Sequence, residues 1–348
     1  MKFFLGVDGG QTSTRMVLGD ERGVILAQAT GGPSNHTEEP GGAARLKAVT
    51  QSTLKKLLEA AGHAPSHALE FVAACFGMTG ELEIKRRVLT PLLETAHLSI
   101  VHDSVNALEG ATAGKPGVIV IGGTGSVARG RNIEGCELSV GGWGHAFGDE
   151  GSAYWIGREA VRAVLAEFDQ MGEKTQLTPM LRERLGIQSP YELIRRYYSA
   201  AFSRDKLAGL APWVDEAAEL KDDIAEGILR RAGLELGRLA TVLLEKLFTQ
   251  ASGAGSRSVV AGALVSYSGG AFNSSRVLSS FVECLKSRYP ACPIQPPQLP
   301  PVLGSLLLAY RAAAIKVGSH RETWPEQLRR LVPKENSRSL GNPAGEPA

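Results

Sequence analysis

The chain has 348 residues, which is long enough for two domains of ordinary size. Its hydrophobic fraction of 43% and its charged fraction of 21% are those of a soluble globular protein. The 38 Lys and Arg residues against 36 Asp and Glu residues leave a net charge of +2, so charge gives no reason to expect a nucleic-acid or membrane partner.

Cysteine usage and the first residues bear on the cellular compartment. The chain has only four cysteines, and none are in C-x-x-C spacing, which is typical of free thiols in a reducing cytosol. Asp8 ends the apolar run at residues 3–7, which is therefore too short for the apolar core of a signal peptide. No apolar stretch reaches the ~18 residues of a transmembrane helix. We therefore expect a cytoplasmic protein with no membrane partner.

Short apolar runs and helical patterns alternate through the first third of the chain. The close spacing of the first three runs favours antiparallel hairpins. Apolar residues that recur three and four positions apart indicate the helices between the later runs. In chain order we expect strands at 3–7, 15–19, 24–29, 69–76 and 98–102, and helices at 46–58, 81–96 and 103–113.

A second set of strands follows, and each half opens with a strand, a glycine-rich turn and another strand. This repetition predicts two related lobes, at 1–113 and 114–316, followed by a C-terminal extension at 317–348. The end of the extension, from residue 334, is rich in Pro, Gly and charge and is expected to be disordered. In the second lobe we expect strands at 117–121, 127–131 and 258–263, helical structure over most of 152–251, and helices at 275–288 and 302–316.

The first glycine-rich turn lies in the segment 6–14, between the first two strands. Glycines such as Gly10 let backbone N–H groups approach a phosphate, and Thr12 adds a hydroxyl donor. Asp8, at the end of the strand, suits Mg²⁺, which takes one or two carboxylates in nucleotide sites and keeps water ligands. The alternative is an ordinary hairpin turn, because Asp-Gly is a common turn pair.

The second turn, 122–126, repeats this design after the apolar strand 117–121. Thr124 supplies a hydroxyl, and Gly125 lets the backbone approach a phosphate. One such turn is weak evidence of nucleotide binding. Two of them, each opening a lobe, predict a nucleotide held in a cleft between Asp8 and Thr124.

Asp103 ends one predicted strand and begins a helix. Aspartate favours the N-cap of a helix, so capping alone would explain the residue. The functional interpretation is a general base that accepts the proton of a hydroxyl attacking the γ-phosphate. The two roles are compatible.

The segment 141–152 holds five glycines in twelve residues, so it is not a regular helix or strand. Trp143 offers an apolar platform and Asp149 an acceptor, a combination that suits a sugar ring. The alternative is a structural loop in which Asp149 or Ser152 caps the following helix.

These motifs together resemble the superfamily of sugar kinases, actin and the heat-shock chaperones. Within it, the likeness is greatest to N-acetylglucosamine kinase and its bacterial relatives. The most specific segments are 141–156 and Ser34-Asn35-His36, which is similar to the sugar-binding loop of that family. The resemblance implies an α/β fold with two ribonuclease H-like (actin-like ATPase) lobes, each a mixed β-sheet flanked by helices, and a cleft between them.

The resemblance also implies roles for individual residues. Asp103 matches the catalytic base, and the hydroxyls of Thr12 and Thr124 match those that contact ATP. Residues that match sugar-binding positions are Asn35, Gly142, Trp143 and Asp149. Two further matches to ATP-contacting segments are Ala208, within 207–209, and Gly262, at the end of 259–262. The loop 269–272 matches no part of the pattern.

The function that follows is phosphorylation of an amino sugar by ATP and Mg²⁺, with O6 of N-acetylglucosamine as the expected acceptor. Glucosamine and N-acetylmuramic acid remain alternatives. The lactyl carboxylate of muramic acid would favour a nearby Arg or Lys, and none lies between 141 and 156. The expected partner is a small-molecule sugar, and a homodimer stays open.

Other classes of function fit the sequence less well. An activator-type ATPase of the same superfamily would share an iron–sulfur cluster between subunits, which needs clustered cysteines. A chaperone needs a long peptide-binding appendage, and the last 30 residues are too few and too polar. A sugar-responsive repressor would need an N-terminal pair of DNA-binding helices, which we do not expect because the chain opens on the first strand.

Overall fold

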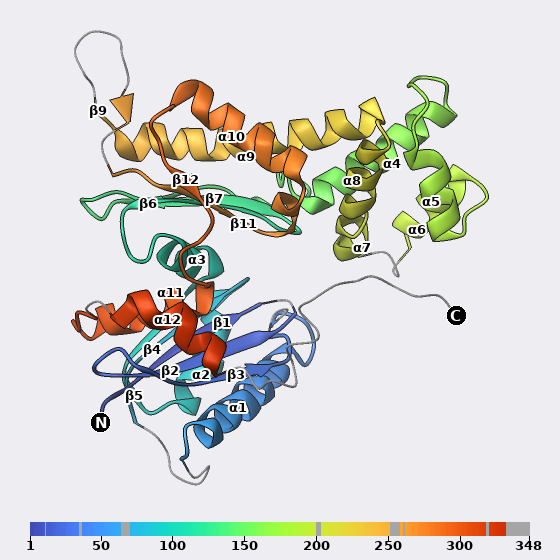
Figure 1. Cartoon of the computed structure of the whole chain (residues 1–348). Coiled ribbons are helices and arrows are strands. Elements are labelled where there is room, and N and C mark those ends of the chain that lie inside the picture. The colour runs from blue at the N-terminus through green and yellow to red at the C-terminus, as the bar shows by residue number, and fades with distance from the viewer. Residues whose placement is uncertain are drawn as a thin grey trace. The chain divides into compact units, whose positions relative to one another are not determined.

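The computed structural model describes residues 1–10, 12–34, 37–63, 70–199, 203–250, 258–259, 262–317 and 320–331. The chain divides into two compact units (Figure 1). Unit 1 is Met1–Gly114 with Gln298–Ala348, and unit 2 is Lys115–Pro297. Within the described ranges, no helix is both long and apolar enough to cross a membrane.

Unit 1 is built on a five-stranded mixed sheet of order β3-β2-β1-β4-β5. The first three strands are antiparallel hairpins, as predicted, and β4 and β5 run parallel to β1. The strands are β1 (Phe3–Gly9), β2 (Thr14–Asp20), β3 (Ile25–Gly31), β4 (Phe71–Met78) and β5 (Thr95–His102). The helices are α1 (Gly42–Ala60), α2 (Leu82–Leu89), the 3-10 turn η1 (Thr90–Leu92), α3 (Asp103–Ala111), α11 (Pro301–Ala312) and α12 (His320–Arg330).

Both faces of this sheet are buried, because its strands alternate apolar side chains toward two different helical layers. Phe4 packs with α11, whereas Leu5 and Val7 pack with α1. Strand β1 and helix α11 approach so closely that a Cβ at Gly6 would lie 2.6 Å from the backbone nitrogen of Leu306. Only glycine fits this position without moving the helix.

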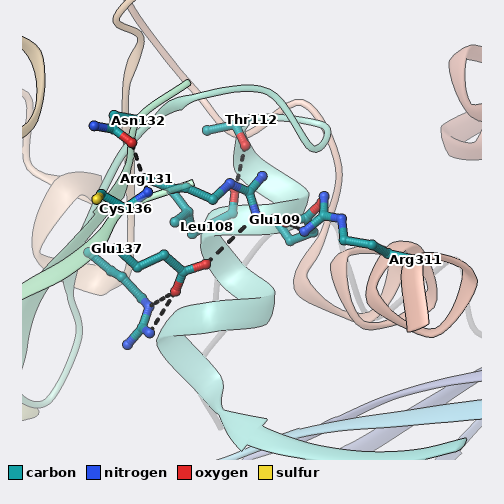
Figure 2. A network of polar contacts seen from close by, with 9 residues as sticks. Leu108, Glu109, Thr112, Arg131, Asn132, Cys136, Glu137 and Arg311 are labelled. Carbon is teal, nitrogen blue, oxygen red and sulfur yellow. Dashed lines mark hydrogen bonds and ion pairs between the residues drawn. The ribbon is translucent and has the colours of Figure 1, made fainter. Parts of the chain in front are cut away.

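Residues 298–316 were expected in the second lobe, but they belong to unit 1. Helix α11 covers the sheet and also packs along α3. The buried carboxylate of Glu109 on α3 accepts hydrogen bonds from Arg311 on α11, with 3.0 Å between Oε2 and Nη1 (Figure 2). The prediction failed because the chain returns to a sheet formed some 200 residues earlier, and local periodicity does not report such a return.

The predicted extension at 317–348 is in part folded structure. Helix α12 lies along β3, the edge strand of the sheet (Figure 1). Its Trp324 is fully buried and donates a hydrogen bond to the carbonyl of Gly23 at 2.6 Å. The Oε1 of Gln327 accepts from the backbone N–H of Ile25 at 2.9 Å, which satisfies an edge-strand donor. The segment from residue 334, expected to be disordered, lies outside the described residues.

Unit 2 repeats the topology of unit 1 in its sheet of order β12-β11-β6-β7-β8. Strands β6, β7 and β8 are antiparallel, and β11 and β12 run parallel to β6. The prediction of two related lobes with mixed sheets is therefore confirmed. The strands are β6 (Gly117–Gly122), β7 (Ser126–Arg131), β8 (Glu137–Gly141), β11 (Val265–Ser268) and β12 (Ile294–Gln295), with a separate pair β9 (Thr249–Gln250) and β10 (Ser258–Val259).

Helices fill the region between β8 and β11, as predicted. The longest, α9, lies against β6, β7 and β8 and packs along α10. Its apolar stripe forms the centre of the unit 2 core together with side chains of α4 and α8. The helices are α4 (Ala153–Phe168), α5 (Leu177–Leu185), α6 (Pro190–Tyr197), α7 (Arg204–Ala208), α8 (Ala211–Glu219), α9 (Asp223–Phe248), the 3-10 turn η2 (Gly270–Asn273) and α10 (Ser275–Arg288).

Four elements differ from expectation. The helix expected at 81–96 ends in η1, and β5 already begins at Thr95, because Pro91 breaks the helical hydrogen bonding. Of the strand expected at 258–263, residues 258 and 259 form β10, residues 262 and 263 are not in a strand, and residues 260 and 261 lie outside the described residues. The central strand is β11. Strands β8 and β12 were missed, since β8 has no buried residue and β12 has only two residues.

Candidate functional site

In unit 1, the predicted acidic residues lie at the carboxyl edge of the sheet. Asp8, on β1, is paired with Gly77 on β4, which is paired in turn with Val101 on β5. Asp103 follows β5 directly. Strands β1 and β5 are two strand spacings apart, roughly 10 Å. The two carboxylates therefore share one edge of one sheet.

Asp103 is the first residue of α3, and the N-cap position belongs to His102. The capping explanation offered for Asp103 is thus wrong by one residue, although its carboxylate still lies in the first helical turn, where the helix dipole favours negative charge. Burial raises the pKa of the Asp103 carboxyl, against the opposing effects of the Ser104 N–H and the charges of His102 and Lys85. A raised pKa makes a carboxylate a better proton acceptor near neutral pH.

Asp8 is held by a residue that the sequence analysis missed. The Nδ2 of the buried Asn106 donates to Asp8 Oδ1 at 3.1 Å, and it fits there because Gly77 has no Cβ. Asn106 lies three residues after Asp103, so both are on one face of α3. The three-residue spacing between Asp103 and Asn106 on a predicted helix is the sequence signal that would have pointed to Asn106.

The environment of Asp8 fits a divalent cation. Burial raises the pKa of its carboxyl, the Asn106 hydrogen bond and Arg15 lower it, and the charge of Asp103 raises it again. Asn106 Oδ1 is buried without a partner in the described part of the chain. No cluster of three or more metal-ligating side chains occurs there either. Mg²⁺ would therefore rest on Asp8 and water, as nucleotide sites allow.

A buried lysine next to the sugar-loop segment also escaped prediction. Lys85 is fully buried on α2, and its Nζ donates to the carbonyl of Glu81 at 3.0 Å. The N–H of Glu81 donates to Glu38 Oε1 at 2.9 Å. Glu38 follows the predicted sugar loop, so this contact ties the loop to α2. The charge of Lys85 is one of the effects that lower the pKa of Asp103.

The first glycine turn closes through hydrogen bonds of Gly10. Its N–H donates to the Ser13 carbonyl at 3.0 Å, and its own carbonyl accepts from the N–H of Ser34 at 3.3 Å. Thr12, between them, is exposed. The turn and the start of the sugar loop are therefore joined. Asn35, predicted to hold the sugar, lies outside the described residues.

In unit 2, the turn at 122–126 lies against α7. Thr124 Oγ1 donates to Asp205 Oδ1 at 3.3 Å. A Cβ at Gly125 would lie 2.8 Å from Asp149 Oδ1 and 3.0 Å from Arg204 Nη2, so two side chains pack directly against this part of the turn.

The loop 141–152 wraps around the same turn. The N–H of Gly142 donates to the Ser126 carbonyl at 2.9 Å, and the N–H of Ser126 donates to Asp149 Oδ1 at 3.0 Å. Ser152 caps α4, so that part of the structural alternative is confirmed. Trp143 is 77% exposed, and its role as a sugar platform stays a prediction.

Asp149 differs from expectation in its surroundings. Its side chain is only 3% exposed, and its Oδ2 pairs with Arg204 Nη2 at 3.0 Å. The residue also has a left-handed backbone, with φ of 65°, which is uncommon outside glycine. The structure thus joins Asp149 to both the second turn and α7.

The two segments expected to contact ATP beyond the turns lie at different places in unit 2. Ala208 lines a cavity of about 340 Å³, together with Gly270 and the start of α4. Gly262, in contrast, lies before β11, at the amino end of the sheet, whereas the glycine turn is at the carboxyl end of β6. The loop 269–272, which matches no part of the family pattern, lies beside the glycine turn 122–126. A Cβ at Gly269 would lie 2.5 Å from the Gly122 carbonyl.

Two units of one topology, each with a glycine turn after its first strand, define the class of protein. The fold is the actin-like ATPase fold, also found in a ROK hexokinase from Thermus thermophilus, which is 16% identical with a TM-score of 0.55 over 90% of this chain and 99% of the other. The chain belongs to the BadF/BadG/BcrA/BcrD ATPase family, whose sequence profile matches residues 5–309.

Several proteins that this chain resembles are named as amino-sugar kinases. An N-acetyl-D-glucosamine kinase from Dictyostelium discoideum is 33% identical over 89% of this chain and 98% of its own length. An N-acetylmuramic acid/N-acetylglucosamine kinase from Clostridium acetobutylicum is 32% identical over 72% of this chain and 82% of its own. A Chromobacterium violaceum structure with a provisional N-acetylglucosamine kinase name is 27% identical, with a TM-score of 0.71 over 89% of this chain and 99% of the other.

Proposed function

We propose that this protein transfers the γ-phosphoryl group of ATP to a hydroxyl of an amino sugar, with O6 of N-acetylglucosamine as the preferred acceptor. The observation that carries the proposal is the half-buried carboxylate of Asp103, at the same sheet edge as Asp8 and one helical turn from Asn106. The names of the relatives at 32% and 33% identity support the choice of acceptor.

Unit 1 supplies the proton acceptor in this proposal. Asp103 accepts a hydrogen bond from the attacking hydroxyl and takes its proton as the new P–O bond forms. Its raised pKa favours that transfer. Asn106 orients Asp8 through its hydrogen bond. Mg²⁺ held by Asp8 and water would supply positive charge against the phosphate oxygens.

Unit 2 supplies donors for the phosphates and a platform for the sugar. The backbone N–H groups of the turn 122–126 and the hydroxyl of Thr124 suit phosphate oxygens. The cavity beside Ala208 and Gly270, at about 340 Å³, suits the base of a nucleotide. The exposed ring of Trp143 suits the apolar face of a pyranose.

The charge of the site bears on the identity of the sugar. The loop 141–156 has no Arg or Lys. Arg204, whose guanidinium contacts this loop, is already paired with Asp149 at 3.0 Å. A carboxylated sugar such as N-acetylmuramic acid would lack a ready partner, which favours the uncharged N-acetylglucosamine.

A coupled assay of ADP release over a panel of sugars tests the proposal. We expect the highest kcat/KM with N-acetylglucosamine, a lower value with glucosamine, and the lowest with N-acetylmuramic acid. ADP release that no amino sugar stimulates would contradict the proposed function. A preference for N-acetylmuramic acid would contradict only the argument from charge.

A further inference from the structure

Arg204, on α7, has a guanidinium group to which the proposed reaction gives no role. It joins three features of unit 2: the predicted sugar ligand Asp149, the glycine turn and the ring of Tyr154. Its Nη2 lies 3.0 Å from Asp149 Oδ2. The same atom lies 3.0 Å from the point where a Cβ would stand at Gly125. Its guanidinium carbon is 6.0 Å from the centre of the Tyr154 ring.

Two observations bear on what this arrangement leaves unused and what it covers. The Nε of Arg204 is buried and has no hydrogen-bond partner among the described residues, so a donor next to the turn is unused. Asp149, in turn, is only 3% exposed, so a sugar hydroxyl reaches its carboxylate only if a covering group moves. The Ser126 N–H belongs to the hydrogen-bonded end of β7 and is fixed. The Arg204 side chain is 35% exposed and is the part free to move.

We propose that Arg204 is a phosphate ligand gated by the sugar. Without sugar, Asp149 holds the guanidinium; when a sugar hydroxyl binds Asp149, the guanidinium turns to the polyphosphate of a nucleoside triphosphate at the turn 122–126. The planar fork of arginine suits two phosphate oxygens, and its unused Nε–H gains a partner there. The added positive charge also offsets Asp205, whose carboxylate accepts from Thr124 beside the same turn.

This inference rests on the proposed function, and it adds a coupling between the two substrates. A sugar that frees Arg204 strengthens nucleotide binding, and by linkage the nucleotide strengthens sugar binding by the same factor. Without sugar, the triphosphate lacks this charge, so hydrolysis of ATP by water stays slow.

Calorimetry with the non-hydrolysable analogue AMP-PNP tests the coupling. In the wild type we expect N-acetylglucosamine to tighten AMP-PNP binding roughly 10-fold, within the usual range of such couplings. Arg204→Gln should abolish the tightening and lower kcat about 10²- to 10³-fold, without raising the Kd for sugar alone. Arg204→Lys should recover part of the kcat. Arg184→Gln is the matched control, because Arg184 of α5 is similarly exposed, at 33%, and pairs with a carboxylate, Glu216 of α8, at 2.5 Å.

Asp149→Asn gives the opposite sign and separates this inference from a purely structural role. Asparagine keeps an acceptor for the Ser126 N–H but loses the charge that holds Arg204. We therefore expect AMP-PNP to bind Asp149→Asn several-fold more tightly than wild type in the absence of sugar. Weaker AMP-PNP binding by Asp149→Asn, or full coupling retained in Arg204→Gln, would overturn the inference. A wild type that phosphorylates no amino sugar would instead overturn the proposed function. The comparison of AMP-PNP binding by wild type and Asp149→Asn without sugar would still test the role of Arg204.

Discussion

Among single side chains, the chemistry depends most on the carboxylate of Asp103. Asp103→Asn preserves the size of the side chain and removes its basicity. We expect kcat to fall about 10²- to 10⁴-fold, the contribution of a positioned acid–base group. In the wild type, the acidic limb of kcat/KM should lie above the ordinary Asp value of 3.8, because burial raises the pKa of this carboxyl. Steady-state kinetics across pH measure both.

The same substitution should not destabilise the protein. The pKa of Asp103 is higher in the folded protein than in the unfolded chain, so protonation of this carboxyl stabilises the fold. That stabilisation is fully present below the ordinary pKa of 3.8 and is lost as pH rises through the raised, folded-state pKa. At neutral pH the half-buried charge is a cost, so Asp103→Asn should leave the Tm unchanged or higher. A sharp drop in Tm with normal kcat in the folded fraction would show that Asp103 is structural.

Asp20 provides the contrasting carboxylate in the same unit. Burial works against its ionisation, but the N–H groups of Val24 and Arg22 and the Arg22 guanidinium outweigh burial and lower its pKa. Its stabilisation is present above the ordinary pKa of 3.8 and is lost as pH falls through the lowered value. Asp20→Asn should therefore lower the Tm at pH 7, with little change in kcat. Thermal melts in which both Asp variants shift alike would contradict this reasoning.

Among the loops, the pair Gly262 and Gly269 tests which glycine serves the nucleotide. Both have positive φ, 103° and 102°, so alanine strains the backbone at either position, by about 1–3 kcal/mol. Only at Gly269 does the new Cβ also meet the turn, 2.5 Å from the Gly122 carbonyl. We expect Gly269→Ala to raise the KM for ATP several-fold and Gly262→Ala to leave it unchanged. An equal rise in the KM for ATP in both variants would show that Gly262 also serves the nucleotide site.

These two glycines also show how far sequence alone reaches. The hairpins, the glycine turns and the positions of Asp8 and Asp103 at strand ends were predictable, because each leaves a local pattern of alternation, turn residues or strand ends. The identity of the central strand in unit 2 was not: β11 has four residues, and its position follows from pairing with β6. Asn106 and Arg204 were missed for the same reason, since their partners lie far away in the chain.

At the level of the whole molecule, α12, the last helix of the described residues, packs on the unit that the first strands build. Trp324 fills the space beside β3, where its ring stacks on Tyr310 and its N–H reaches Gly23. Trp324→Ala should lower the free energy of unfolding by about 3–5 kcal/mol, as for other buried aromatics. Trp324→Phe keeps most of the packing and should cost less. Denaturant melts that show no loss for the alanine variant would mean that α12 adds no stability to unit 1.

The central claim is that the phosphoryl group leaves ATP for a sugar hydroxyl rather than for water. The most direct test is phosphorus–proton correlation NMR on the product mixture from purified protein, ATP, Mg²⁺ and N-acetylglucosamine. We predict a phosphomonoester signal that correlates with the two protons on C6 of the sugar, in amounts equal to the ADP formed. Inorganic phosphate as the only new phosphorus species would contradict the account and would identify the protein as an ATPase.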